Sequence, residues 1–297
     1  MPPSEPTSEP TQVTLGLLRG WALPTPTGTK DERGVVLVVG GSRDTVGAVR
    51  LAGEAALRVG AGKLQIATAR SAAAALGVAM PEALGRPLPE DHDGALDAAA
   101  AGELVELAGA ADVVLLGPGL VGKHPARTLV EELLPSVRGR LVLDALGMAA
   151  VAPGTGRLAA GRGPAVLTPN VRELSISLGR EQGDVEADLP DAVRSLVAAT
   201  GAVVRSGSDR PVVADPDGRA WVEDAAPAGL GVSGSGDVLA GTVAGLLARG
   251  AEPAQAAVWA SRLHAEAANR VATRVGPVGY LAREVAAELP WALRHVG

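Results

Sequence analysis

The order of apolar runs and amphipathic segments predicts an α/β fold, with a doubly wound, mostly parallel sheet and helices on both faces. Short aliphatic runs bounded by glycine recur along the chain, as strands buried on both faces of a parallel sheet require. Segments with apolar residues three and four apart separate these runs, as crossover helices do. Ligands of such folds bind beyond the carboxyl ends of the strands, so the loops there are where chemistry is expected.

The first strand and helix carry the clearest pattern. Residues 34–40 read Gly-Val-Val-Leu-Val-Val-Gly, which predicts a buried strand. Residues 48–59 place apolar side chains on one helical face and end at Gly60-Ala61-Gly62, where a helix C-cap is expected. Residues 64–68 are then predicted to form the next strand.

The alternation continues along the rest of the chain. Further strands are predicted at 113–116, 141–143, 166–167 and 203–204, and helices at 126–134, 191–199, 237–249 and 253–270. Residues 212–214 and 220–222 flank Asp215-Pro216-Asp217-Gly218 and predict a hairpin. No linker interrupts this order. We therefore expect one domain over residues 25–297 and a disordered or loosely ordered tail over residues 1–24.

Composition excludes several classes of function. A net charge of -6 and a pI near 5.3 argue against a nucleic-acid partner, which would need a clustered cationic surface. The chain has no cysteine, which excludes disulfides and thiol nucleophiles and favours a cytoplasmic location. No run approaches the roughly 20 apolar residues of a membrane span, so no membrane partner is expected. Assembly into a homo-oligomer stays open.

A glycine-rich loop before the apolar segment 237–249 is the strongest candidate site. It reads Gly229-Leu-Gly-Val-Ser-Gly-Ser-Gly-Asp237. Glycines ahead of a helix aim backbone N–H groups at one point, and the helix dipole adds positive potential there, so the loop is expected to bind an anion. Asp237 cannot bind an anion itself, but it could accept the proton of an attacking hydroxyl. The alternative is that Asp237 only caps the helix.

A resemblance to a known family rests on the order and spacing of several motifs. The Gly-x-Gly-Asp of residues 234–237 resembles the anion hole of the ribokinase-like superfamily. Over residues 30–290 the chain resembles one member of it, the ADP- or ATP-dependent NAD(P)H-hydrate dehydratases. The shared motifs are Lys30-Asp31, Gly40-Gly41-Ser42, Gly47-Ala48, Gly60-Ala61-Gly62, Gly117-Pro118-Gly119-Leu120, Thr168-Pro169, Glu173, residues 233–245, His264 with Ala267, and Gly276 with residues 279–282.

The resemblance implies a ribokinase-like fold and the repair of hydrated NADH and NADPH. In that chemistry ADP or ATP, with Mg²⁺, phosphorylates the ring hydroxyl, and phosphate then leaves. Asp237 would be the catalytic base and would also contact the hydrate, together with Ala48, Gly119 and Asn170. The nucleotide would be bound by Arg205, Ser206, Gly207, Ser208, Asp209, Gly234, Ser235 and Gly236. Its partners would be these small molecules. The metal ligands stay unassigned.

Three positions depart from the family pattern. Asn170 stands where relatives commonly carry histidine, so any contact with the hydrate would come from an amide. Leu146 replaces the second carboxylate of an Asp-Ala-Asp motif that begins at Asp144. Arg205 replaces a lysine, which keeps the charge and changes its geometry. These changes keep two alternatives open: a ribokinase-like kinase of a vitamin precursor or sugar, and a non-catalytic nucleotide-binding protein.

Other motifs favour structural interpretations. Gly117-x-Gly119-x-x-Gly122 follows a predicted strand and matches a dinucleotide-binding fingerprint, but no acidic residue ends a second strand at the expected distance. His264 lies on the apolar face of its predicted helix and is expected to be a hydrogen-bonded core histidine. Glu173 is expected to cap the helix that it opens rather than to bind a ligand.

Overall fold

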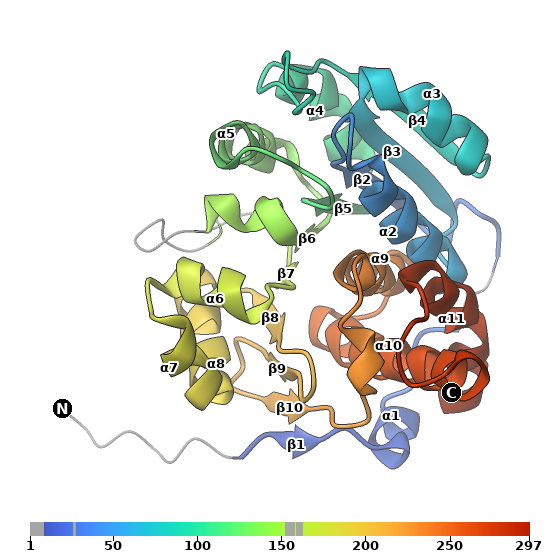
Figure 1. The fold of residues 1–297 in the computed structure, drawn as a ribbon, viewed down its shortest axis with the longest axis vertical. Coiled ribbons are helices and arrows are strands. Elements are labelled where there is room, and N and C mark those ends of the chain that lie inside the picture. Colours follow the sequence, from blue (N-terminus) through green and yellow to red (C-terminus); the bar gives the residue numbers. More distant parts are fainter. Residues whose placement is uncertain (1–8, 26–27, 152–157, 159–162) are drawn as a thin grey trace.

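The strands of the protein form one continuous sheet that runs through the middle of the molecule (Figure 1). The computed structural model describes residues 9–25, 28–151, 158 and 163–297. The strand order is β1-β10-β9-β8-β7-β6-β5-β2-β3-β4. The strands are β1 (Thr11–Gln12), β2 (Val35–Val39), β3 (Lys63–Ala69), β4 (Ala83–Leu88), β5 (Val113–Leu116), β6 (Arg140–Leu143), β7 (Ala165–Leu167), β8 (Val203–Ser206), β9 (Val212–Ala214) and β10 (Ala220–Val222).

Most strand pairs are parallel, which confirms the predicted doubly wound sheet. The exceptions are β9 with both of its neighbours, which gives the predicted hairpin with β10. Side chains alternate across the sheet, so Val36 and Val38 of β2 enter one core cluster while Leu37 and Val39 enter the other. Apolar residues at successive positions are therefore all buried, which is why the strand reads as a continuous aliphatic run.

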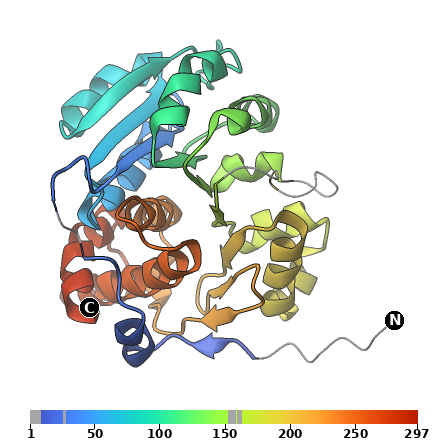
Figure 2. The same ribbon diagram turned by 180° about the vertical axis from the view of Figure 1, so that it is seen from behind.

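Helices cover both faces of the sheet (Figures 1 and 2). One core cluster lies under α2 (Val46–Arg58), α9 (Ser235–Ala248), α10 (Pro253–Val275) and α11 (Ala282–Val296). The other lies under α4 (Ala100–Ala110), α5 (Lys123–Leu133), α6 (Val171–Leu178) and α8 (Leu189–Thr200). The remaining helices are α1 (Leu15–Gly20), α3 (Arg70–Ala79), α7 (Gln182–Ala187) and the short 3₁₀ turns η1 (Leu134–Ser136), η2 (Ala145–Ala150) and η3 (Ala228–Leu230).

The expectation of a loose tail over residues 1–24 is wrong for its second half. Strand β1 extends the sheet through parallel pairing with β10, and Leu18 of α1 is fully buried. Trp21 stacks on Trp221 at a ring-centroid distance of 5.5 Å, and its carbonyl accepts hydrogen bonds from Gln255 and Trp259. The proline-rich sequence hides this order because the contacts of Trp21 and the pairing of β1 involve residues that are distant in the chain. Residues 1–8 lie outside the described residues.

The edge strand β4 also escaped prediction. Its sequence, Ala-Leu-Gly-Arg-Pro-Leu, includes a glycine and a proline, which weaken a strand and confine it to the edge of a sheet. It occupies that edge beside β3. None of the described helices is long and apolar enough to cross a membrane.

Candidate active site

Helix α9 begins at the glycine-rich loop and points its first turn toward the carboxyl edge of the sheet. Gly234 is the N-cap and has a φ of 87°, a left-handed conformation that favours glycine. Ser235, Gly236 and Asp237 form the first turn, where backbone N–H groups have no partner within the helix. A Cβ on Gly236 would have no heavy atom within 4 Å. The turn is therefore open for a ligand anion to approach its amides.

A cavity of about 550 Å³ lies against this turn, and we call it the carboxyl-edge cavity. It is bounded by residues that follow β6, β7 and β8 and by the start of α9. Its size is in the range of small-molecule sites. Of the residues predicted from the sequence, the cavity brings together Asn170, Arg205, Gly207, Ser208, Asp209, Ser235, Gly236 and Asp237.

Asp237 has the electrostatics of a general base. Burial, followed by the nearby charge of Glu173, raises the pKa of its carboxyl to about 6. Within the described residues this carboxylate accepts no hydrogen bond, and α9 has no side-chain cap bond. The alternative that Asp237 only caps the helix therefore lacks the hydrogen bond that a cap requires. A carboxylate with a pKa near the working pH, facing a cavity, is suited to accept a proton.

A second carboxylate, Asp144, lies in the same cavity at the end of β6. It is 6% exposed and accepts a hydrogen bond of 2.7 Å from Thr168 Oγ1. Burial raises the pKa of Asp144 well above its usual value, against the hydrogen bond from Thr168, and the charges of Asp237 and Glu173 add to the rise. The two aspartates therefore interact, and a cation between them would favour the ionised form of both.

Asn170 and Glu173 form a capping box at the start of α6. The Oδ1 atom of Asn170 accepts from the N–H of Glu173 at 2.9 Å, and Glu173 accepts from the N–H of Asn170 at the same distance. The predicted capping role of Glu173 is thereby confirmed. Asn170 also lines the cavity, so its side chain borders the space that a ligand would occupy.

Arg205 is buried at the end of β8 and shapes the loop that follows it. Its guanidinium donates one hydrogen bond of 2.7 Å to the carbonyl of Gly207 and one of 3.3 Å to Ser261 Oγ. Burial lowers its pKa to about 10, against the charges of Asp144 and Glu223, so Arg205 is still cationic at neutral pH. Gly207, with a φ of 100°, turns the chain so that Ser208 and Asp209 reach the cavity. Arg205 thus holds this loop through Gly207.

Four predicted residues lie outside the cavity lining. Ser206 is fully buried, and Gly234 packs toward Leu51 and Ala282. Ala48 and Gly119 lie beside each other, since a Cβ on Gly119 would stand 2.9 Å from that of Ala48.

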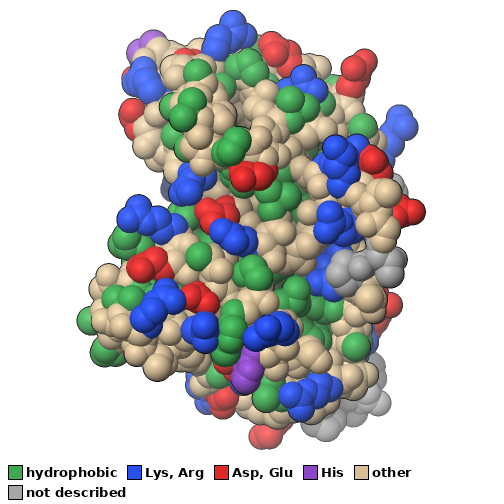
Figure 3. Space-filling view, turned by 90° about the vertical axis from the view of Figure 1, so that its right-hand side faces the viewer, with side chains coloured by type: hydrophobic (Ala, Val, Ile, Leu, Met, Phe, Trp, Pro, Cys, Tyr) green, Lys and Arg blue, Asp and Glu red, His purple; other side chains and the backbone are tan. Residues whose placement is uncertain are grey.

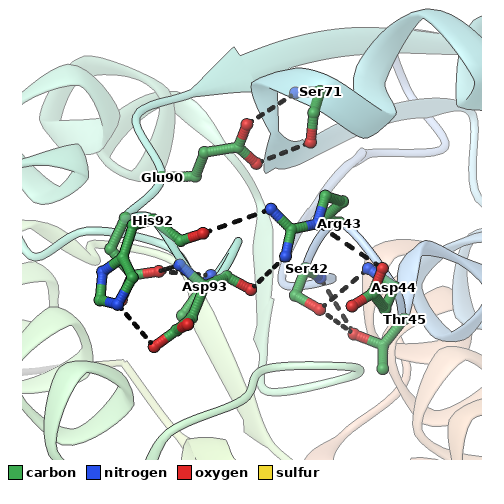
Figure 4. Close-up of polar contacts among 10 residues, drawn as sticks. Ser42, Arg43, Asp44, Thr45, Ser71, Glu90, His92 and Asp93 are labelled. Carbon is green, nitrogen blue, oxygen red and sulfur yellow. Dashed lines mark hydrogen bonds and ion pairs between the residues drawn. The ribbon is translucent and has the colours of Figure 1, made fainter.

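The loop after β2 contacts Gly119 through Thr45, and Figure 4 shows the contacts of Thr45 with Ser42 in the same loop. Thr45 Oγ1 donates a hydrogen bond of 2.6 Å to the carbonyl of Gly119, and it accepts one from the N–H of Ser42. Arg43 donates to the carbonyls of His92 and Asp93 in the next loop along the edge. The Ala48–Gly119 pair is therefore a fixed surface on the β2–β5 part of the sheet, apart from the carboxyl-edge cavity.

His264 is the cavity residue whose position sequence reasoning undervalued. It is 3% exposed, and its Nε2 lies 3.2 Å from Ser235 Oγ, which confirms the expected hydrogen-bonded core histidine. It also lines the cavity, as do Gln182 and Glu186 of α7. No local motif marks the last two. Their helix reaches the cavity only through tertiary packing.

Comparisons with known proteins identify the family. The model of the family described as NAD(P)H-hydrate dehydratase matches residues 36–291. The ADP-dependent (S)-NAD(P)H-hydrate dehydratase of Xanthomonas campestris pv. campestris is 43% identical over 289 residues, with 95% of each chain covered. The chain belongs to the NAD(P)H-hydrate dehydratase family. It is therefore an enzyme of the hydro-lyase class, as predicted.

Solved structures agree with this family and its fold. The ADP/ATP-dependent NAD(P)H-hydrate dehydratase of Bacillus subtilis, co-crystallised with ATP/Mg²⁺, superposes with a TM-score of 0.82 at 25% identity, covering 97% of this chain and 99% of that one. Ribokinase from Thermotoga maritima, at 16% identity, superposes with a TM-score of 0.51 over 86% of this chain and 99% of its own. The predicted ribokinase-like fold is thereby confirmed.

Proposed function

We propose that this member of the NAD(P)H-hydrate dehydratase family restores hydrated NADH and NADPH in the carboxyl-edge cavity, with Asp237 as the catalytic base. The observation that carries the proposal is the unpaired Asp237 carboxylate, with a pKa of about 6, in the first turn of a helix that begins at the carboxyl-edge cavity. The proposed co-substrate is ADP or ATP with Mg²⁺. The Xanthomonas relative, whose name specifies ADP and the S epimer, supports ADP and that epimer for this chain.

In the proposed reaction, Asp237 accepts the proton of the C6 hydroxyl while the hydroxyl oxygen attacks the terminal phosphoryl group of the nucleotide. ADP then leaves as AMP, or ATP as ADP. The bond between C6 and the phosphorylated oxygen then breaks with help from the ring-nitrogen lone pair, and phosphate departs with the bonding electrons. Loss of a proton from the neighbouring carbon restores the double bond. Phosphorylation is needed because hydroxide is a poor leaving group.

The described residues fit a nucleotide with its metal ion. The amides of the first turn of α9 face open space at Gly236, where a phosphate chain can approach. Among the described residues no group of three or more acidic or histidine side chains could hold a metal ion. Magnesium is usually held by phosphates with one or two carboxylates, and Asp144 in the cavity lining can supply one. The bound ion would neutralise phosphate charge.

The remaining site assignments are those expected from the family resemblance. Asn170 in the cavity lining is proposed to contact the hydrate, together with Ala48 and Gly119, which lie outside that lining, and residues 205–209 are proposed to bind the nucleotide. Asn170 and Gly207 both border the carboxyl-edge cavity, which supports neighbouring positions for the two ligands. A cytoplasmic location and assembly into a homo-oligomer stay predictions. Cationic and anionic side chains are interspersed on the face drawn in Figure 3.

The direct test is to incubate purified protein with chemically hydrated NADH, Mg²⁺ and either ADP or ATP, and to follow recovery of NADH absorbance. We expect recovery with nucleotide and none without it. A stable phosphate ester without NADH recovery would instead indicate a kinase. Nucleotide binding without any turnover would indicate a non-catalytic protein. Either result would contradict the proposal.

A further inference from the structure

The buried pair of His264 and Ser235 joins helix α10 to the first turn of α9. His264 Nε2 lies 3.2 Å from Ser235 Oγ, and Ser235 is 8% exposed where it borders the carboxyl-edge cavity. Among the hydrogen bonds of the described residues, this is the one that Ser235 Oγ makes. The hydroxyl therefore has one fixed partner inside the protein and one free direction.

The other ring nitrogen of His264 decides which atom donates. Nδ1 is buried and has no hydrogen-bond partner among the described residues. Burial, followed by the nearby positive charge of Arg205, lowers the pKa of His264 to about 3, against a hydrogen bond with the Ser235 backbone, so the ring is neutral and carries one hydrogen. A hydrogen on Nδ1 would be a buried donor without an acceptor, and orphaned buried N–H groups are rarer than under-satisfied acceptors. The hydrogen therefore belongs on Nε2.

With the hydrogen on Nε2, the imidazole donates and Ser235 Oγ accepts. The hydroxyl hydrogen of Ser235 is then not used in the hydrogen bond with His264, and it can point into the cavity. It joins the N–H groups at the start of α9, which already favour an anion. With the opposite tautomer, the serine would donate to His264 and would have only lone pairs for a ligand. A phosphate oxygen would be repelled.

We propose that His264 is a positioning residue that orients the Ser235 hydroxyl as a hydrogen-bond donor to a phosphate oxygen of the nucleotide. The inference rests on the proposed function for the presence of a nucleotide, and adds how its phosphate is recognised. It also gives the buried histidine a role beyond packing.

The first experiment measures ADP and adenosine binding by calorimetry. Ser235→Ala is expected to lower the affinity for ADP about ten- to a hundredfold, which is the effect of losing a hydrogen bond to a charged group. The affinity for adenosine should not change. His264→Leu should lower the affinity for ADP to a similar extent. The double variant should bind ADP no more weakly than Ser235→Ala alone. Additive losses, or equal losses for adenosine, would overturn the inference.

Two controls separate positioning from folding. Thr242→Val removes another buried hydroxyl of α9, which donates to Val238 O within the helix, and should leave ADP binding unchanged. His264→Gln places an amide NH₂ near the position of Nε2 and should retain most of the affinity, whereas His264→Asn should not. Equal affinities for Gln and Asn would contradict positioning.

The tautomer can be read without any unstable variant. Long-range ¹H–¹⁵N correlation spectra of the parent protein should show the His264 hydrogen on Nε2, with its resonance identified by its loss in His264→Gln. A hydrogen on Nδ1 would overturn the inference while leaving the proposed function standing. A parent protein that binds no ADP would overturn the nucleotide assignment and this inference with it.

Discussion

The start and the body of helix α9 use glycine in opposite ways. At its start, Gly236 faces open space, and a Cβ there would meet no heavy atom within 4 Å. One turn later, a Cβ on Gly241 would stand 2.0 Å from the carbonyl oxygen of Ala52, and one on Gly245 would stand 2.4 Å from that of Ala56. The first glycine leaves room for a ligand, and the later two let α9 pack backbone to backbone on α2.

This comparison teaches that a glycine-rich motif mixes two requirements. The close packing of α9 on α2 fixes where the helix begins, and the loop glycines keep that beginning accessible to an anion. Changes at the start and in the body of the helix should therefore separate ligand binding from stability. The following predictions run from the largest expected effect to the smallest.

Gly241→Val is expected to destabilise the fold by more than about 4 kcal/mol, because the new side chain would overlap the backbone of α2. Thermal unfolding followed by circular dichroism measures the loss. Gly236→Val, on the same helix but facing open space, is the matched control and should melt close to the parent. A Gly241→Val protein that melts within a few degrees of the parent would show that α2 and α9 can move apart at little cost in folding free energy.

Asp237→Asn is expected to lower kcat by about 10²- to 10⁴-fold, the usual effect of removing a general base. Its melting temperature at pH 8 should equal or exceed that of the parent. The raised pKa of Asp237 means that the folded protein gives up stability as pH rises through about 6, and asparagine avoids this loss. A turnover within a few-fold of the parent would remove Asp237 from the chemistry.

Gly236→Val is expected to lower the affinity for ADP at least about tenfold while the fold stays intact. The valine side chain would fill the space through which phosphate reaches the backbone amides. Calorimetry measures the affinity. Gly236→Ala serves as the smaller step and should have an intermediate effect. If the valine variant bound ADP as tightly as the parent, the phosphate site would have to lie elsewhere.

The pH dependence of kcat/KM should follow the ionisation of Asp237. Since only the carboxylate accepts a proton, the rate should be level above the pKa of about 6 and should fall toward tenfold per pH unit below it. Steady-state rates between pH 5 and 8 test this. The carboxyls of Asp144 and Glu173 face the same cavity and couple to this titration. A level profile down to pH 5 would assign the base to another group.

Asn170→Ala is expected to raise the KM for the hydrate several-fold with little change in the KM for nucleotide. It should also cost about 1 kcal/mol of stability, because it removes the N-cap of α6. Asn170→Ser is the matched control, since serine caps a helix but has no amide group. It should recover the stability and keep the raised KM. A change confined to the nucleotide KM would move Asn170 to the other ligand.

The pattern of residues in the sequence was sufficient to predict much of the sheet and the start of α9. Residues 34–40 and the hairpin at 212–222 were predicted because buried strands and tight turns depend on adjacent residues. The anion site could be predicted because glycines and a helix start are local features. The resemblance then supplied the chemical role of Asp237, which spacing alone left open between base and cap.

Residues distant in the chain decided the rest. Strand β1 is ordered by pairing with β10, and the pKa of Asp237 depends on burial and on Glu173. The pairing of His264 with Ser235 likewise joins residues 29 positions apart. Hydrogen bonding and desolvation act over a few ångströms in space, whatever the separation in sequence. The sequence thus determined the elements and the family motif, and the tertiary structure decided which side chains share the cavity and in what protonation state.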